Sequence, residues 1–334
     1  MSKKIAVFSS KPYDEEQLQK ALSDDALQFT FFEPKLTWQT VALAKGFDGV
    51  CCFVNDVVDA DVVKALADYG IKIIAMRCAG FNNIDLNACS AHEIALARVP
   101  EYSPCAVAEH AVALILDLNR NIHRAFSRVR ENDYSLNGLM GFSLHGKTVA
   151  VIGGGKIGIA FIKIMKGFGC RVLCFDPKPS DELKSMDIEI VELGSIWEQS
   201  DIISLHCPLV KQTYHLINSN SLSQMKDGVM LINTSRGALI DTPAVIAALK
   251  TGRVGYLGLD VYEEEADLFF EDNSNEVLQD DIFARLTTFK NVVITGHQAF
   301  FTEEALKAIA ETTVTNLSSF FSGDLDAVNF VNKY

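Results

Sequence analysis

The chain has 334 residues, of which 49% are hydrophobic and 22% charged, and its 30 basic and 43 acidic side chains give a formal net charge of -13. This length allows two domains with substantial cores, and the negative charge disfavours nucleic acid and anionic lipid as partners. Because the first apolar run is too short for a signal-peptide core and no later run could span a bilayer, we expect a cytoplasmic protein without a membrane partner.

The N-terminal part alternates between short apolar segments and helical segments. Four strands are expected at residues 4–9, 29–33, 49–54 and 71–78, each rich in apolar or β-branched side chains. This alternation predicts a parallel α/β unit. A long helix should follow, since Ser103 stands where an N-cap belongs and Pro104 at the first helical position.

A second series of strands begins after that helix. Six strands are expected, at residues 148–153, 171–176, 201–208, 229–235, 255–262 and 291–297. Six parallel strands with helical crossovers make a complete doubly wound sheet. The last segment then predicts a helix capped by Thr302, long enough to return to the first unit.

These patterns predict an α/β protein of two doubly wound parallel sheets, in which a nucleotide-binding domain at 102–298 is inserted into a domain made of residues 1–101 and 299–334. The eight cysteines lack the repeated Cys-x-x-Cys or Cys/His spacing of a zinc site. We therefore expect reduced thiols, largely in the core, and no metal.

The segment "KTVAVIGGGKIGIA" predicts a dinucleotide-binding turn. Gly153, Gly155 and Gly158 stand between a strand and a helix. In this motif the first glycine permits a tight turn, the second lets the backbone approach the pyrophosphate, and the third allows close packing of helix on strand. The amides around Lys156 and Ile157 would then hold the phosphates at the helix N-terminus. An ordinary glycine turn is the simpler alternative.

Asp176 ends the next strand, where a carboxylate would accept hydrogen bonds from the adenosine ribose. Its charge would repel the additional phosphate of NADP, so NAD is the expected cofactor. Lys178, two residues later, could soften this preference because a cation there can meet that phosphate.

Polar residues follow the last three strands, at the sheet edge where α/β proteins bind ligands. They are Arg236, Asp260 with Glu265, and His297. Each has a simpler explanation, because an arginine can pair with a structural carboxylate, a glutamate can be solvated, and a histidine can be merely packed. Their joint placement favours catalysis. His206, at the end of another strand of this sheet, is the main rival to His297.

At these residues the chain resembles the D-isomer-specific 2-hydroxyacid dehydrogenases over essentially its whole length. The shared strings are "RCAGFNNID", "AVAEHA", the glycine turn, "SLHCPL", "NTSRGALID", "LDVYEEE", "DLFFED" and "TGHQAF". The resemblance implies reversible hydride transfer between NAD and a small 2-hydroxy acid, with pyruvate as the expected oxo acid. Arg236 falls on the family's substrate-binding arginine, His297 on its acid/base, and Glu265 on the partner that orients the histidine.

The same resemblance implies further contacts. Substrate contacts fall on Ala79, Gly80, Tyr102, Arg236, His297 and Phe300. Cofactor contacts beyond the glycine turn and Asp176 fall on Cys207, Pro208, Thr213, Thr234, Ser235, Arg236 and Asp260. Because family members pair through the nucleotide domain, residues 121–144 would form a dimer arm, and a homodimer or homotetramer is expected.

Two alternatives remain open at this point. Relatives that reduce glyoxylate or 2-oxoisocaproate share the trio, because pocket size depends on contacts that sequence order does not reveal. A NADH-sensing binding protein, like the corepressors that share this fold, could use the cofactor without appreciable turnover. Formate dehydrogenases are set aside, since they carry glutamine where Glu265 stands.

Overall fold

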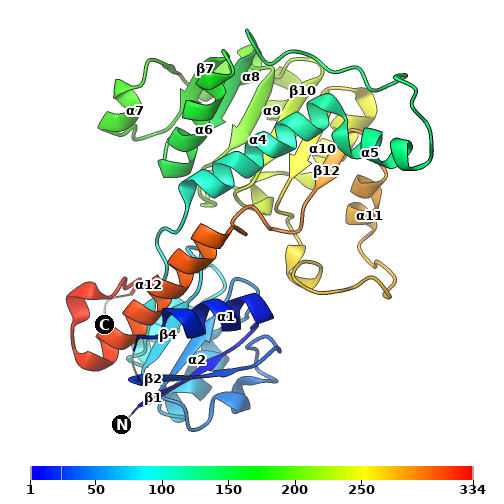
Figure 1. Ribbon diagram of the computed structural model, residues 1–334. Coiled ribbons are helices and arrows are strands. Elements are labelled where there is room, and N and C mark those ends of the chain that lie inside the picture. Colours follow the sequence, from blue (N-terminus) through cyan, green and yellow to red (C-terminus); the bar gives the residue numbers. More distant parts are fainter. Residues whose placement is uncertain (1, 24, 333–334) are drawn as a thin grey trace. The chain divides into compact units, whose positions relative to one another are not determined.

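Five parallel strands form the sheet of the N-terminal part, in the order β2-β1-β3-β4-β5 (Figure 1). The computed structural model describes residues 2–23 and 25–332. The strands span Lys3–Val7 (β1), Leu27–Phe31 (β2), Gly49–Cys52 (β3), Ile73–Met76 (β4) and Ala95–Ala97 (β5). The first four were expected, but β5 was missed, because three residues are too few to show a periodic pattern.

Helices flank this first sheet and build its core. They are α1 (Pro12–Ala21), η1 (Val41–Ala44), α2 (Ala60–Asp68) and α3 (Leu86–Ala91). The last long helix, α12 (Glu303–Ser322), begins at Thr302, whose side chain accepts from the Ala305 amide, as predicted. It packs beside α1 and contributes Ala310, Val314 and Leu317 to one cluster with Ile5 and Val7 of β1.

The C-terminal residues complete the first sheet. After α12 and η4 (Leu325–Ala327), Phe330 forms an isolated bridge with Ala97, and the Val331 amide donates to Leu96 O. The chain therefore returns to its N-terminal sheet across more than two hundred intervening residues.

The second sheet has seven parallel strands, in the order β12-β11-β10-β9-β6-β7-β8. They span Thr148–Ile152 (β6), Arg171–Phe175 (β7), Glu189–Ile190 (β8), Ile202–Leu205 (β9), Val229–Asn233 (β10), Val254–Leu259 (β11) and Val292–Ile294 (β12). Six were predicted. The seventh, β8, is an exposed pair of residues at the sheet edge, which carries no apolar signal. The expected class, α/β with two parallel sheets, is confirmed.

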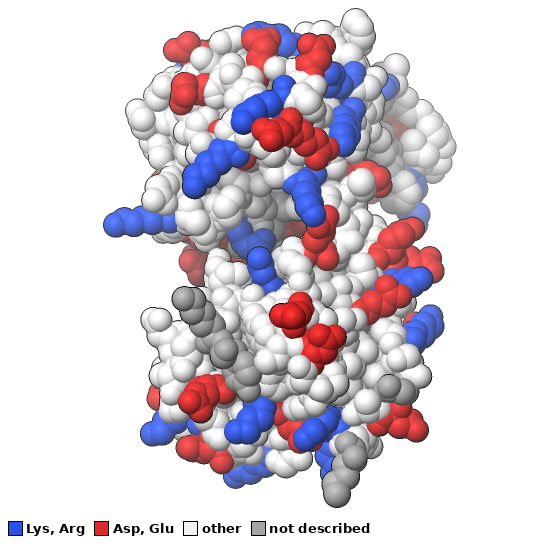
Figure 2. Space-filling view, turned by 90° about the vertical axis from the view of Figure 1, so that its left-hand side faces the viewer, with Lys and Arg blue, Asp and Glu red and all other residues white. Residues whose placement is uncertain are grey.

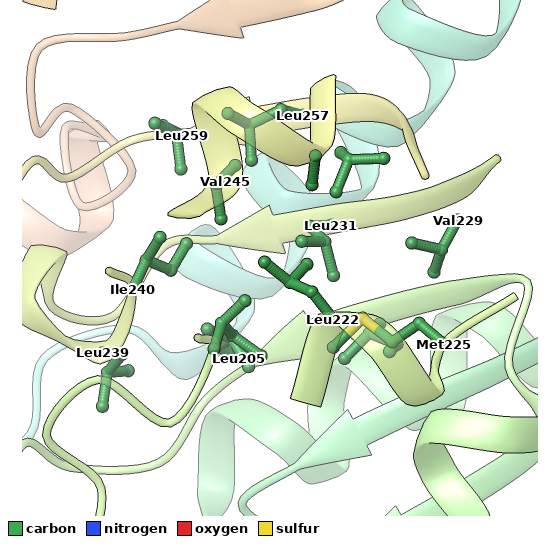
Figure 3. Close-up of a cluster of buried hydrophobic side chains, with 14 of the residues drawn as sticks. Leu205, Leu222, Met225, Val229, Leu231, Leu239, Ile240, Val245, Leu257 and Leu259 are labelled. Atoms are coloured by element: carbon green, nitrogen blue, oxygen red, sulfur yellow. The ribbon is translucent and has the colours of Figure 1, made fainter. Parts of the chain in front are cut away.

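Helices cover both faces of the second sheet. They are α4 (Pro104–Arg120), α5 (Ile122–Arg130), α6 (Lys156–Gly167), α7 (Asp181–Ser185), α8 (Leu193–Gln199), α9 (Ser219–Gln224), α10 (Thr242–Thr251) and α11 (Asp281–Thr287), with the short helices η2 (Gly237–Leu239) and η3 (Glu265–Asp267). Alternate residues of β6 enter two different cores, since Val149 and Val151 pack with α4 and α6 whereas Ala150 and Ile152 face α8 to α10. Figure 3 shows part of the second core, including Leu231 and Leu257.

The chain divides into two compact units, Met1–Ser103 with Phe301–Tyr334, and Pro104–Phe300. The expected boundaries, after residues 101 and 298, lie close to these.

Basic and acidic side chains are interspersed on the face shown in Figure 2. Among the described helices, none has the length and apolar character that a bilayer crossing requires.

Candidate active site

The glycine turn between β6 and α6 is shaped by backbone crowding. Gly153 has φ +104°, and a Cβ there would lie 2.6 Å from His206 C and Cys207 N. A Cβ on Gly158 would overlap Gly153 O. At Gly155, in contrast, a Cβ would meet no atom within 4 Å. The protein therefore requires glycine at the first and third positions for its own packing, and the open side of Gly155 fits a ligand that approaches the backbone.

This difference predicts distinct outcomes for two substitutions. Gly155→Ala should leave the melting temperature nearly unchanged, because φ is -73° and the site is open. It should weaken NADH binding, since the new methyl group occupies the space of the pyrophosphate. Gly158→Ala should weaken both NADH binding and stability. Fluorescence titration with NADH and thermal melting measure the two effects, and unchanged NADH affinity in Gly155→Ala would refute the pyrophosphate assignment.

Asp176 lies beyond the end of β7, beside the same turn. Its Oδ2 accepts from the Gly154 amide at 2.8 Å and its Oδ1 from the Lys178 amide at 2.7 Å. These hydrogen bonds hold the carboxylate in one orientation, and each oxygen keeps a second acceptor position for a ribose hydroxyl. Lys178 contributes its backbone amide to this arrangement.

Side-chain hydrogen bonds hold the segments that follow β9 and β10. Ser235 donates its hydroxyl to Cys207 O at 2.7 Å, and Thr213 donates to Pro208 O at 2.6 Å. Thr234 Oγ1 is buried and has no hydrogen-bond partner among the described residues. A buried hydroxyl without a partner is costly unless a ligand satisfies it, so Thr234 fits a polar cofactor at this edge.

Arg236 follows β10, and its guanidinium hydrogen-bonds to a backbone carbonyl. Nη1 donates to Ser235 O at 2.6 Å, and Asn233 fixes the Arg236 carbonyl at 2.8 Å. The side chain forms no ion pair with any carboxylate in the described part of the chain. The described residues therefore give no support to the simpler explanation, a structural ion pair, and the guanidinium can bind an anionic ligand.

Glu265 and His297 form a pair. His297 Nδ1 lies 2.8 Å from Glu265 Oε1, and Glu265 Oε2 accepts from the Tyr262 amide at 2.9 Å. The side chains are 17% and 22% exposed, so Glu265 is not a solvated surface acid. A carboxylate at Nδ1 selects the tautomer that carries its proton there, which leaves Nε2 for exchange with a ligand.

Asp260 holds the loop that carries His297. It is fully buried, and its carboxylate accepts from the Thr295 hydroxyl at 2.5 Å and from the Gln298 and Ala299 amides at 2.9 Å each. His297 itself has φ +53°, a conformation that non-glycine residues adopt only when surrounding contacts support it. Asp260 thus has a positioning role that sequence reasoning did not predict, beside the expected contact with the cofactor carboxamide.

His206, the rival histidine, lies in a different environment. Burial lowers its pKa to about 3. Its Nε2 is 2.9 Å from Ser204 Oγ, and its ring packs on Phe161 at 5.0 Å between centroids. Its ring therefore stays neutral near pH 7 and contacts no carboxylate of residues 2–23 and 25–332, which favours His297 as the acid/base.

The remaining expected substrate residues lie in both units. In the first unit, Arg98 donates to Ala79 O at 2.8 Å and Cys78 Sγ to Gly80 O at 3.2 Å. The Ala79 and Gly80 amides donate to no acceptor in the described part of the chain, as an anion site requires. Tyr102 also belongs to the first unit. Phe300, in the second, lies 6.4 Å from the His297 ring, centroid to centroid.

Three residues with contacts near this sheet edge were not among the predicted site residues. The Phe270 ring lies 5.6 Å from the His297 ring, centroid to centroid, and the backbone of Phe270 is strained, with φ +69°. His110 Nε2 contacts Thr295 Oγ1 at 2.9 Å, and His215 pairs with Glu263. Only the strings "DLFFED" and "AVAEHA" pointed toward two of them. Among the described residues no cluster of His, Cys, Asp or Glu could hold a metal.

The chain is similar to known proteins over nearly its whole length. Residues 112–299 match the NAD binding domain of the D-isomer specific 2-hydroxyacid dehydrogenases. The chain is 51% identical to D-lactate dehydrogenase of Escherichia coli over 321 residues, which cover 96% of this chain and 98% of that protein.

Solved structures show the same similarity. The apo-structure of the E. coli D-lactate dehydrogenase aligns with a TM-score of 0.87 at 49% identity, covering 96% of this chain and 97% of that one. A D-lactate dehydrogenase from Aquifex aeolicus, complexed with NAD and lactic acid, aligns with a TM-score of 0.88 at 34% identity, covering 99% of both chains.

Proposed function

Because this chain belongs to the D-isomer-specific 2-hydroxyacid dehydrogenases, we propose that it reduces pyruvate to D-lactate with His297 as the acid/base. It is an NAD-dependent oxidoreductase acting on D-2-hydroxy acids. NAD, the cofactor expected from the glycine turn and Asp176, is confirmed by the match to the NAD binding domain. The contact of 2.8 Å between His297 Nδ1 and Glu265 Oε1 carries the assignment of roles.

NADH, when bound, supplies the hydride that reduces the oxo carbon. His297 Nε2 donates a proton to the carbonyl oxygen in this direction and accepts it back in the oxidative direction. Glu265, fixed by the Tyr262 amide, holds Nδ1 and so keeps Nε2 directed at the substrate. A neutral ring remains after the proton has left Nε2, so the pair is ready for a new proton from water.

Arg236 binds the 2-oxo acid. Its planar guanidinium can donate two parallel hydrogen bonds to a carboxylate and can also reach the oxo group. The Ala79 and Gly80 amides, which lack acceptors among the described residues, bind the substrate carboxylate in this proposal. We also assign Tyr102 and Phe300 to substrate binding. We assign the unit of Met1–Ser103 with Phe301–Tyr334 as the substrate-binding domain, and the other unit, which also carries Arg236 and His297, as the NAD-binding domain.

The chain acts as a homodimer or homotetramer in this proposal. Residues 121–144 expose apolar side chains that a second copy could cover. These side chains and their exposed fractions are Ile122 (54%), Phe126 (62%), Val129 (52%), Leu136 (82%) and Met140 (89%). All eight cysteines are free thiols, which suits the reducing cytoplasm, where we place the enzyme.

The assay that tests this function follows NADH consumption with pyruvate and identifies the product with a D-lactate-specific enzyme. Fast, pyruvate-dependent oxidation that yields D-lactate is expected, with NADPH much less effective because Asp176 repels its phosphate. Faster turnover with glyoxylate or 2-oxoisocaproate would keep the mechanism and change the substrate. The absence of turnover with all three acids would contradict the enzymatic function and favour a NADH sensor. NADPH used as efficiently as NADH would contradict the role of Asp176.

A further inference from the structure

A second histidine and glutamate pair lies in the same unit as the catalytic pair. His215 Nε2 is 2.6 Å from Glu263 Oε1, and the two side chains are 28% and 19% exposed. The Tyr214 ring stacks on the His215 ring at 4.0 Å between centroids. This contact is more shielded than the solvent-exposed ion pairs that contribute little to a structure.

The pair joins segments that follow two different strands. His215 lies between β9 and α9, whereas Glu263 follows β11. Because β10 lies between these strands in the sheet, the contact reaches across the segment after β10, which carries Arg236. The pair therefore links three segments at the ligand-binding edge of the sheet.

The segment after β10 is held on both sides. On one side, the His215 amide donates to Ala238 O at 2.9 Å and the Ile217 amide to Leu239 O at 3.0 Å. On the other side, a Cβ on Gly237 would overlap the Tyr262 carbonyl carbon and the Glu263 nitrogen. Leu239 is anchored in the core beside this segment (Figure 3). The backbone next to Arg236 thus lies in close contact with both partner segments.

Glu263 is also close in sequence to the catalytic pair. The Tyr262 amide, one residue earlier, donates to Glu265 Oε2 at 2.9 Å, and Glu265 Oε1 holds His297. Tyr262 is itself fixed, because its hydroxyl donates to Asp280 at 2.6 Å. His215 adds a side-chain anchor at the next residue, before the chain turns into η3 at Glu265.

We propose that His215 and Glu263 are positioning residues, whose contact fixes the backbone around Glu265 so that this carboxylate keeps His297 aligned for proton transfer. The inference rests on the proposed function, because it deepens the role of the same site. Neither residue touches the reacting atoms in this assignment. Their effect should therefore reach turnover only through Glu265.

The test measures kcat and KM for pyruvate, normalised to the number of NADH-binding sites from fluorescence titration. His215→Asn removes the contact while retaining a residue that tolerates the φ of +48° found at this position. Glu263→Ala removes the contact from the other side, and Glu263→Gln keeps an acceptor for Nε2. We expect His215→Asn and Glu263→Ala to lower kcat about tenfold, a modest part of what a misplaced catalytic group can cost. Glu263→Gln should lose less, and NADH affinity should stay within about twofold because the glycine turn is untouched.

A second set of variants distinguishes positioning from a general loss of stability. In a Glu265→Ala background, His215→Asn should lower kcat less than about twofold, since the group through which it acts is already removed. Equal losses in both backgrounds, or no loss in the wild-type background, would overturn the proposal. The wild-type rate tests the proposed function separately, and if another 2-oxo acid is the better substrate, the same ratios are measured with that acid.

Lys226→Met supplies the matched control. Lys226 pairs with Asp201 at 2.9 Å and joins the segments that precede β10 and β9, at the opposite edge of the same sheet. This substitution also removes a partly exposed ion pair between neighbouring strands. Its kcat should match that of the wild type, and a similar loss in Lys226→Met would show that any such pair affects turnover, which would contradict the proposal.

Discussion

Replacement of His297 by Gln is expected to lower kcat for pyruvate about 100- to 10,000-fold, which is the contribution of a positioned general acid. Gln fills a similar volume and can still donate a hydrogen bond, but it cannot release a proton to the substrate. The NADH dissociation constant should change little, because the glycine turn and Asp176 are held by contacts that do not involve His297. Steady-state kinetics and fluorescence titration with NADH measure the two quantities.

Glu265→Gln is the informative companion of that variant. It keeps an amide oxygen that accepts from Nδ1 and leaves the acid/base in place, so its loss in kcat should be smaller than that of His297→Gln. Retention of more than a tenth of the wild-type turnover in His297→Gln would contradict the assignment of the acid. His206 would then need to be examined, although its buried and neutral ring is poorly suited to the role.

Replacement of Arg236 by Gln is expected to lower kcat/KM for pyruvate by about 30- to 4,000-fold, which corresponds to about 2 to 5 kcal/mol for removing one partner of a close charged pair. The loss should appear largely as a raised KM, because the arginine binds the acid in both the ground state and the transition state. Arg236 forms no ion pair with another described residue, so its replacement should change the melting temperature little.

Arg236→Lys separates charge from geometry. Lysine keeps the positive charge but lacks the planar fork, so its kcat/KM should lie between those of the wild type and Arg236→Gln. A lysine variant equal to the wild type would show that only charge matters, which contradicts a two-bond contact. A Gln variant within about threefold of the wild type would exclude Arg236 from substrate binding on the same energetic argument.

Much of the nucleotide turn could be predicted from the sequence because its determinants are local. Gly158 is required by its contact with the Gly153 carbonyl, within one strand, turn and helix, and Asp176 follows the adjacent strand. The crowding of Gly153 by His206 and Cys207, in contrast, comes from the segment after β9. The placement of Arg236, Glu265 and His297 at one sheet edge also followed from strand order, since parallel strands end on the same side. The fold class was predictable for the same reason. The two missed strands, β5 and β8, are too short to show a period.

The contacts between segments that are distant in the sequence could not be predicted. His206 and His297 both follow strands of one sheet, and only the packed structure shows that one is buried beside Phe161 while the other faces Glu265. The contact of His215 with Glu263 spans 48 positions in the sequence. No local pattern identifies such partners.

The two parallel sheets, the glycine turn and NAD as the cofactor therefore followed from the sequence, because periodicity and strand order act over short distances or at a common edge. The roles of Arg236, Glu265 and His297 stay a prediction that the variants above test. Only the packed structure showed that His297 rather than His206 contacts a carboxylate, that Arg236 forms no ion pair among the described residues, and that Asp260 holds the loop of His297. The physical reason is that protonation state and side-chain orientation depend on burial and on hydrogen-bond partners, and these partners are brought together only when distant strands pack into one sheet.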